Sequence, residues 1–219
     1  MHHRPAFGLS PLVLLGLGAC ASGGQAGAPE QQDQLVTWIE RVHVEAERSR
    51  QSIADSFERL NVLAAGRFDK EPAAVVYAKF VQSIDSAEQQ RRRFREVVGP
   101  MLDAGKPVFS RRQAELHAIS SDRLRQRGEV RFAIDKERYD AITAAAVPAQ
   151  DQFDAFVKAL QDHASFLAYD LNPGSIAEIQ PEVKVVARSA RELDHNMESC
   201  QAAARAFVEQ SALPAVPAR

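Results

Sequence analysis

Two pairs of residues have the spacing of metal ligands. They are Glu40 with His43 and Glu192 with His195. A carboxylate and an imidazole three residues apart share one face of a helix, and some helical bundles use two such pairs to hold two iron ions. His195 lies nearly opposite the stripe of apolar residues on its predicted helix. Glu40 and His43 lie on either side of the apolar stripe of the first predicted helix. The sequence therefore predicts surface positions, and a metal-carrying bundle is only a remote alternative.

Other catalytic patterns are missing from the sequence. The chain has no nucleophile elbow, phosphate-binding loop, His-Glu-x-x-His or Cys-x-x-Cys motif. His117 and His163 have no matching partners, and we expect them at the surface or beside a stripe. We therefore predict no catalytic residue, no metal, no cofactor and a non-enzymatic role.

The start of the chain has the pattern of a targeting signal. A basic segment (1–4) precedes an apolar segment (9–17) that is too short to span a membrane. The apolar segment ends in Leu17, Gly18, Ala19 and Cys20. Small residues just before a cysteine resemble the lipobox of bacterial lipoproteins, in which a peptidase cuts before the cysteine and the sulfur receives a diacylglycerol.

The lipobox resemblance implies a signal peptide over 1–19 and a lipidated Cys20. Residues 20–32 are rich in Gly, Ala, Ser and Gln, which predicts a flexible tether. In the sorting rules of bacterial lipoproteins, an Asp directly after the cysteine favours retention at the inner membrane. This chain has Ala21 there, so its resemblance to such lipoproteins favours the outer membrane. The alternative is an ordinary secretory signal with a cysteine there by chance. We expect a folded domain over 33–212 and a disordered tail over 213–219.

The folded part has the composition and the periodicity of helices. Ala accounts for 36 of 219 residues and Thr occurs twice, so residues that favour strands are scarce. Apolar residues recur in alternating steps of three and four, which predicts helices over 33–67, 71–119 and 122–171. A fourth helix is predicted from a capping box of Ser175 and Glu178 to about 211. The predicted apolar stripe of the first helix comprises Leu35, Ile39, Val42, Ala46, Ile53, Phe57, Leu60 and Ala64, and that of the third includes Leu160. The stripe of the fourth comprises Ile176, Ile179, Val183, Val186, Ala190, Leu193, Met197, Cys200, Ala204 and Phe207.

Several prolines interrupt these helical patterns. A proline inside a helix removes one backbone hydrogen bond and kinks the helix. The segment 99–107 contains Pro100 and Pro107, and two alternatives stay open for it, a kinked helix or a true loop. Pro148 and Pro181 mark two further weak points.

The predicted helix lengths indicate an architecture. The first and fourth helices would be roughly 55 Å long, and the second and third roughly 75 Å. Short turns make successive helices antiparallel neighbours. We therefore predict an all-α fold, an elongated antiparallel four-helix bundle resembling a coiled coil. The two long central helices should outrun the others by about a dozen residues, so that a hairpin (108–134) projects.

Charge is unevenly distributed along the chain. Residues 91–131 contain 11 Arg and Lys against 5 Asp and Glu, whereas residues 132–212 contain 7 against 13. The basic excess surrounds the hairpin, which predicts contact with an anionic surface. The candidate residues for this contact are Arg111, Arg112, Arg123, Arg125, Arg127 and Arg131. The alternative is that these arginines pair across the hairpin, and we expect the basic run 89–95 to pair with nearby acids.

Cys200 lies on the apolar stripe of the fourth predicted helix. This position predicts a buried, unreactive thiol. The alternative is an intermolecular disulfide, because the periplasm is oxidising and a lipidated Cys20 would leave Cys200 without a partner.

Many positions match a family pattern, most densely in the second half of the chain. They are Phe109, Glu115, Leu116, Ser120, Leu124, Arg125, Arg138, Tyr139, Asp140, Asp162, Phe166, Leu167, Leu171, Asn172, Ile176, Ala177, Gln180 and Glu182. With these residues the chain resembles the helical bacterial lipoproteins known as domain of unknown function 2959. It departs from the family at Ala168, Tyr169 and Asp170, where Lys-His-Asn is usual. The resemblance covers about 33–211 and implies an envelope lipoprotein with long helices, but no activity.

These observations predict a lipid-anchored structural or scaffold protein of the bacterial cell envelope, facing the periplasm from the outer membrane. The alternative is a membrane-surface module that binds anionic lipid through the Arg-rich hairpin. Expected partners are the membrane, through the lipid, and a protein partner or a second copy of the chain. The formal net charge of −2 argues against nucleic acid as a partner.

Overall fold

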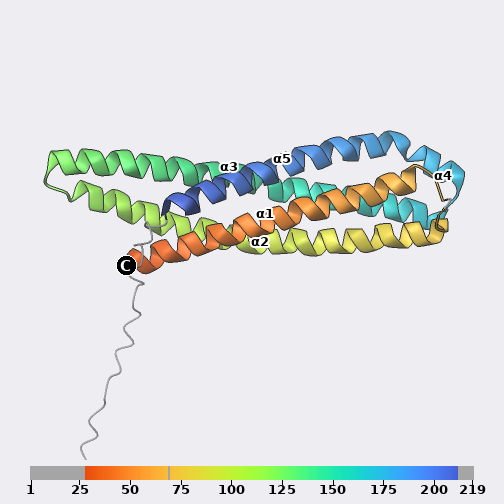
Figure 1. Ribbon diagram of the computed structural model, residues 1–219, viewed down its shortest axis with the longest axis horizontal. Helices are drawn as coiled ribbons and strands as arrows, with labels where there is room; N and C mark the ends of the chain where they lie inside the picture. The colour runs from red at the N-terminus through yellow and green to blue at the C-terminus, as the bar shows by residue number, and fades with distance from the viewer. Residues whose placement is uncertain (1–27, 69, 212–219) are drawn as a thin grey trace, which may run out of the picture.

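The computed structural model describes residues 28–68 and 70–211, and this part of the chain is helical throughout apart from its turns. The helices are α1 (Ala28–Ala64), α2 (Ala73–His117), α3 (Asp122–Tyr169), α4 (Pro173–Glu178) and α5 (Gln180–Ser211). The four long helices run side by side in an elongated bundle (Figure 1). The predicted all-α class and antiparallel bundle are confirmed.

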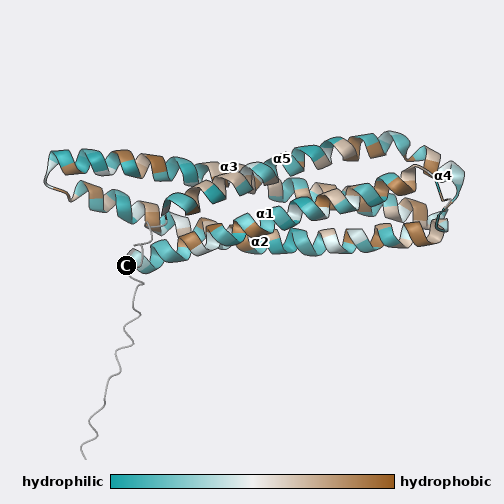
Figure 2. Ribbon diagram, viewed as in Figure 1, coloured by the Kyte–Doolittle hydropathy of each residue, from teal (hydrophilic) through white to brown (hydrophobic). Residues whose placement is uncertain are grey.

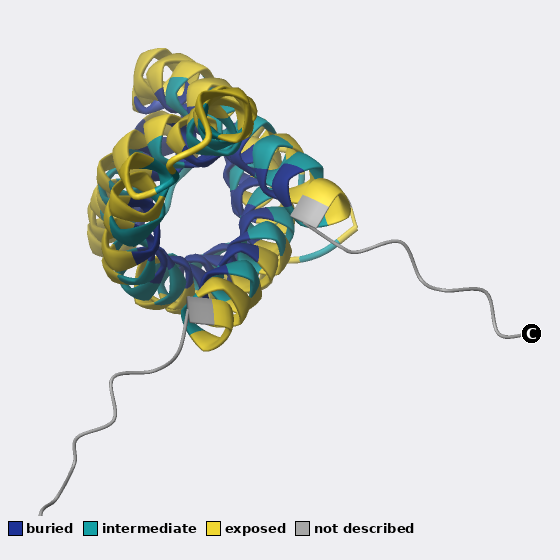
Figure 3. Cartoon of the chain, turned by 90° about the vertical axis from the view of Figure 1, so that its left-hand side faces the viewer, coloured by how far each residue is buried: buried dark blue, intermediate teal, exposed yellow. Residues whose placement is uncertain are grey.

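The long helices form a ring. Both α1 and α3 pack against α2 and α5, so helices that follow each other around the ring are antiparallel (Figure 1). Seen along the bundle, the buried residues face the centre and the exposed residues face outward (Figure 3). Apolar and polar residues accordingly alternate along each helix (Figure 2).

The core follows the predicted apolar stripes closely. All ten stripe positions predicted for the fourth helix are buried: Ile176, Ile179, Val183, Val186, Ala190, Leu193, Met197, Cys200, Ala204 and Phe207. In α1 only Phe57 of the predicted stripe is less than fully buried, and it still packs against the core. The alternation of three and four steps therefore keeps one face of each helix on its neighbours over the length of the bundle.

Polar residues complete the stripes where the sequence pattern showed gaps. Ser49 and Ser56 are buried in α1, and each hydroxyl donates to the carbonyl four residues earlier, at 2.7 Å and 2.8 Å. Gln90 is buried in α2, and its Nε2 donates to the Glu45 carboxylate at 2.8 Å. These hydrogen bonds satisfy polar groups that would otherwise destabilise the core.

The segment 99–107 is helical throughout, so the loop alternative is wrong. Met101 and Val108 are buried, and Tyr139 of α3 packs against Gly105. Packing against α3 therefore outweighs the backbone hydrogen bonds that Pro100 and Pro107 remove. Similarly, α3 continues through Pro148.

The predicted single fourth helix is wrong, because the chain forms α4 and α5 with Ile179 between them. Pro181 lies in the first turn of α5, where its missing N–H costs little. The predicted capping box is also wrong. The side chain of Asn172 caps α4 by accepting from the backbone N–H groups of Gly174 and Ser175. Ser175 is instead a buried residue inside α4.

The first helix begins earlier than predicted. Because α1 starts at Ala28, residues 28–32 are helical and do not belong to a flexible tether. Pro29 suits a first helical turn, and the acidic Glu30 is favourable near the positive end of the helix dipole. The predictions for residues 1–27 and 212–219, including the signal peptide and the tail, lie outside the described residues.

The hairpin of α2 and α3 projects from the bundle. It extends beyond the start of α1 and the end of α5 (Figure 1), and no residue from 110 to 138 is buried. The predicted projecting hairpin is therefore confirmed. The ion pair between Arg112 and Asp135 marks the base of the hairpin. From Asp135 back to Asp122, the first residue of α3, the hairpin is about 13 residues or ~20 Å long.

Candidate functional site

The two Glu-x-x-His pairs lie on the surface of the bundle. Glu40, Glu192 and His195 are exposed, as predicted, whereas His43 is half-buried. The Nδ1 atom of His43 lies 3.1 Å from the carbonyl oxygen of Gln201 on α5. Within residues 28–68 and 70–211, no group of three or more His, Cys, Asp or Glu side chains could hold a metal ion. The structure thus places His43 in a contact between two helices.

The other two histidines of the described residues differ in their surroundings. His117 is exposed at the end of α2. His163 is half-buried, with its Nδ1 2.6 Å from the carbonyl oxygen of Ala159. His163 also lines a shallow pocket between α3, α4 and α5, together with Asp162, Phe166, Glu178, Ile179 and Glu182. Sequence analysis did not find this pocket, because its residues meet only where the three helices pack.

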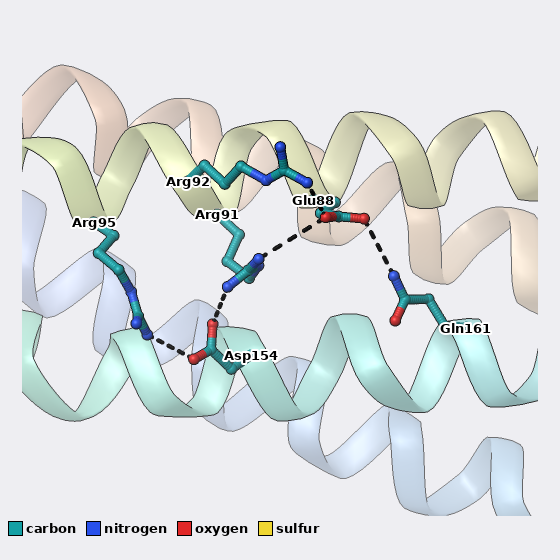
Figure 4. A network of polar contacts seen from close by, with 6 residues as sticks. All are labelled: Glu88, Arg91, Arg92, Arg95, Asp154 and Gln161. Carbon is teal, nitrogen blue, oxygen red and sulfur yellow. Dashed lines mark hydrogen bonds and ion pairs between the residues drawn. The ribbon is translucent and has the colours of Figure 1, made fainter.

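The basic run of α2 is paired, as predicted (Figure 4). Arg91 and Arg95 each contact a different oxygen of Asp154 on α3 at 2.6 Å. Arg92 pairs with Glu88 one turn earlier, and this hydrogen bond lowers the pKa of the Glu88 carboxyl. Glu88 also accepts from a glutamine amide of α3 (Figure 4). This network joins α2 to α3, and its two carboxylates, Glu88 and Asp154, neutralise half of the charge of the four arginines in the run.

Three of the six candidate arginines of the hairpin pair within the protein. Arg111 donates to Gln31 of α1 and lies 3.9 Å from Glu115. Arg112 bonds to Asp135 across the hairpin at 2.8 Å.

Arg125 is the third paired arginine. It bonds to Asp122 and lies 3.9 Å from Glu129. Its Nη1 also donates to the carbonyl of Ile119 at 3.3 Å, which ties it to the turn of the hairpin.

The other three candidates, Arg123, Arg127 and Arg131, are exposed. None of them has an ion pair with any residue that the structure describes. We call the surface that they share with three exposed aliphatic residues the hairpin face. The hairpin face consists of Arg123, Leu124, Arg127, Val130, Arg131 and Ile134. Sequence analysis found the arginines by their charge but missed the aliphatic side chains between them.

Cys200 is buried in the core, and among the residues that the structure describes it has no disulfide partner. Burial raises the pKa of its thiol to about 12, so the thiol stays protonated at neutral pH. The predicted buried position is confirmed. A disulfide with a second chain would require the core to open.

The lipobox residues Leu17, Gly18, Ala19 and Cys20 lie outside the described residues. Helix α1 begins at Ala28, at the same end of the bundle as the hairpin (Figure 1). Among the described helices, none is both long enough and apolar enough to cross a membrane.

The fold and these surfaces define an elongated helical bundle with a projecting, partly basic hairpin. A model of the family described as "Protein of unknown function (DUF2959)" matches residues 24–211. The chain therefore belongs to this family, as the resemblance in the sequence implied. Comparison with curated proteins and with solved structures gives no match.

Proposed function

We propose that the protein is a lipid-anchored spacer or scaffold of the bacterial cell envelope, with a structural and not an enzymatic role. The observation that carries this proposal is the position of the start of α1 at one end of the bundle. Ala28 follows Cys20 by eight residues and lies at one end of an elongated bundle. A lipid on Cys20 would therefore hold the bundle by its end and allow it to extend away from the membrane.

The interior of the bundle supports a structural role. Apolar side chains fill the core from Leu35 near the start of α1 to Leu63 near its end. Ion pairs between helices, such as Arg50 with Asp194 at 2.8 Å and the Asp154 network, join neighbouring helices on the outside. A helical bundle packed in this way keeps its ends at a fixed separation, as a spacer must.

The anchor is tested by substituting the two cysteines separately. Cys20→Ala should abolish lipidation and leave the precursor unprocessed or mislocalised, so its intact mass should show no acyl group. Cys200→Ala is the matched control, because it removes a thiol in the core and should leave processing and detergent partitioning unchanged. A mature form of the unchanged protein without acyl mass would contradict the proposal.

The choice of membrane is tested by separating inner and outer membranes on a density gradient. We propose that the protein faces the periplasm from the outer membrane, because Ala and not Asp follows Cys20. The unchanged protein should sediment with the outer membrane, and Ala21→Asp should move it to the inner membrane. Finding the unchanged protein in the inner membrane would contradict this assignment.

A further inference from the structure

The hairpin face combines positive charge with exposed apolar surface. Leu124 and Val130 are each 57% exposed and Ile134 is 40% exposed. At 3.6 residues per turn, the six residues of the hairpin face lie within about 120° of the circumference of α3. The opposite side of this part of α3 faces α2, where Phe132 contacts the ring of Phe109 at 6.1 Å between centroids. At the edge of the hairpin face next to α2, Arg131 lines a shallow groove with Leu116 and Ile119, and the rest of the face points away from the protein.

The charge of the hairpin face is not neutralised by its surroundings. Four acids of the hairpin pair with arginines outside this face, namely Glu115, Asp122, Glu129 and Asp135. Glu137, one turn nearer the bundle than Ile134, is exposed and pairs with no described residue. The three arginines of the face thus present a concentrated positive charge around Leu124, Val130 and Ile134.

We propose that the hairpin face docks on the anionic phosphate surface of a lipid bilayer. Helices that lie at a membrane interface have this composition, because their aliphatic side chains enter the boundary between head groups and acyl chains. Arginine guanidinium groups at the edge of such a face bind lipid phosphates while their stems cover apolar surface. Together, three arginines should raise the affinity for an anionic surface on the order of 100-fold at low salt.

The position of the hairpin identifies the membrane, and this step rests on the proposed anchor. Gln31, in the first turn of α1, accepts a hydrogen bond from Arg111 at the base of the hairpin. Residues 20–27 can span at most ~28 Å between a lipid on Cys20 and Ala28. The hairpin extends ~20 Å from its base in the direction away from the bundle. The bilayer that holds the lipid is therefore within reach of the hairpin face.

The test uses the mature full-length protein on vesicles of neutral phosphatidylcholine and on vesicles with about 30% anionic phosphatidylglycerol. Hydrogen exchange is measured for peptides from 118–134, with peptides from the buried part of α5 as an internal reference. Anionic vesicles should slow exchange in the hairpin several-fold, and neutral vesicles should not. About 0.5 M salt should reverse much of this protection.

Two triple variants with equal changes in charge make the test specific. Arg123→Glu, Arg127→Glu and Arg131→Glu together should abolish the protection by anionic vesicles. The control is Lys184→Glu, Arg188→Glu and Arg191→Glu on α5, three exposed cations near the opposite end of the bundle. The control should keep the protection. Circular dichroism should show that both variants keep the helical content of the unchanged protein.

Three results would overturn the proposal. The first is equal protection on neutral and anionic vesicles, and the second is loss of protection in the control variant. The third is protection without vesicles that grows with protein concentration, which would assign the face to a second copy of the chain. Binding to neutral vesicles separately reports the lipid anchor. A protein without an anchor would fail to bind them, whereas its hairpin would still respond to anionic vesicles.

Discussion

Gly105 in α2 faces Tyr139 in α3 at the base of the hairpin. Tyr139 is 7% exposed, and its hydroxyl donates to the carbonyl of Met101 at 3.3 Å. Burial of the phenol raises its pKa to about 12. A Cβ atom on Gly105 would overlap the phenol ring. This close approach explains why a glycine occupies the interior of a long helix, where it is ordinarily less favourable than Ala.

Gly105→Ala should therefore lower the free energy of unfolding by about 1–3 kcal/mol, because Tyr139 must move to admit the new methyl group. Gly99→Ala is the matched control in the same helix. Apart from the neighbouring residues and the backbone of α2 itself, no atom lies within 4 Å of a Cβ at Gly99. The gain expected for Ala in a helix is opposed by the clash of its Cβ with the ring of Pro100, so Gly99→Ala should change the free energy of unfolding by less than about 1 kcal/mol. Urea unfolding of both variants measures the difference. Equal stability of Gly105→Ala and the unchanged protein would contradict the packing described here.

The pairing of the hairpin arginines could not be read from the sequence. Arg112 pairs with Asp135, and this contact depends on how α2 and α3 align across the turn. Arg111 reaches Gln31, which belonged to the predicted tether and not to a helix. The sequence therefore predicted the position of the positive charge, but only the packing of three helices shows which arginines are free to bind something else.

At the scale of the helices, the apolar stripes were predictable because burial imposes their period. The stripe of α5 has an apolar residue at every step, and all its predicted positions are buried. The stripes of α1 and α2 are interrupted by Ser49 and Gln90, whose burial depends on hydrogen bonds to particular carbonyl and carboxylate oxygens. Such polar positions carry no periodic signal of their own, so sequence analysis left them out.

Leu160 in α3 and Leu193 in α5 are fully buried at the middle of their stripes. Leu160→Asp or Leu193→Asp would place a charge without a partner in the core. The cost is several kcal/mol, comparable to the whole stability of a domain, so each variant should lose most of its cooperative thermal unfolding in circular dichroism. His195→Ala, at an exposed position of α5, should unfold like the unchanged protein. An unaltered melting curve for either Asp variant would contradict the burial of that leucine in the core.

At the start of α4, the spacing of a capping motif predicted the wrong capping residue. Ser175 and Glu178 have the spacing of a capping box, yet Asn172 makes the capping hydrogen bonds at 2.7 Å and 3.0 Å. Both Asn and Ser are good capping residues. The difference arises because Pro173 occupies the first turn, which starts the helix before Ser175 and places the serine in the core.

Asn172→Ala should accordingly lower the free energy of unfolding by about 1 kcal/mol, since it removes both capping hydrogen bonds. Glu178→Ala changes an exposed side chain and should alter stability by less than about 0.5 kcal/mol. Guanidinium unfolding of the two variants, compared with the unchanged protein, distinguishes the observed cap from the capping box. A larger loss for Glu178→Ala than for Asn172→Ala would favour the capping box.

At the scale of the whole molecule, the long helices fix an elongated shape. The 48 residues of α3 alone span ~72 Å. Small-angle scattering should therefore give a radius of gyration of about 22 Å or more, as expected for a rod of that length. A compact domain of similar size would give about 16 Å. A value near 16 Å would show that the bundle folds back on itself in solution.

The orientation of this rod follows from where the chain would be attached. The start of α1 and the hairpin lie at the same end of the bundle (Figure 1). A lipid on Cys20 would bring that end to the membrane and direct α4 away from it. The hairpin face would then add a second contact that limits how the rod tilts.

Mass spectrometry of the N-terminal peptide, taken from protein purified from the membranes of its own cells, tests lipid anchoring most directly. We predict that the mature chain begins at Cys20 and that this residue carries the added mass of a diacylglycerol. A mature chain that begins at another residue, or an unmodified Cys20 at the N-terminus, would contradict it.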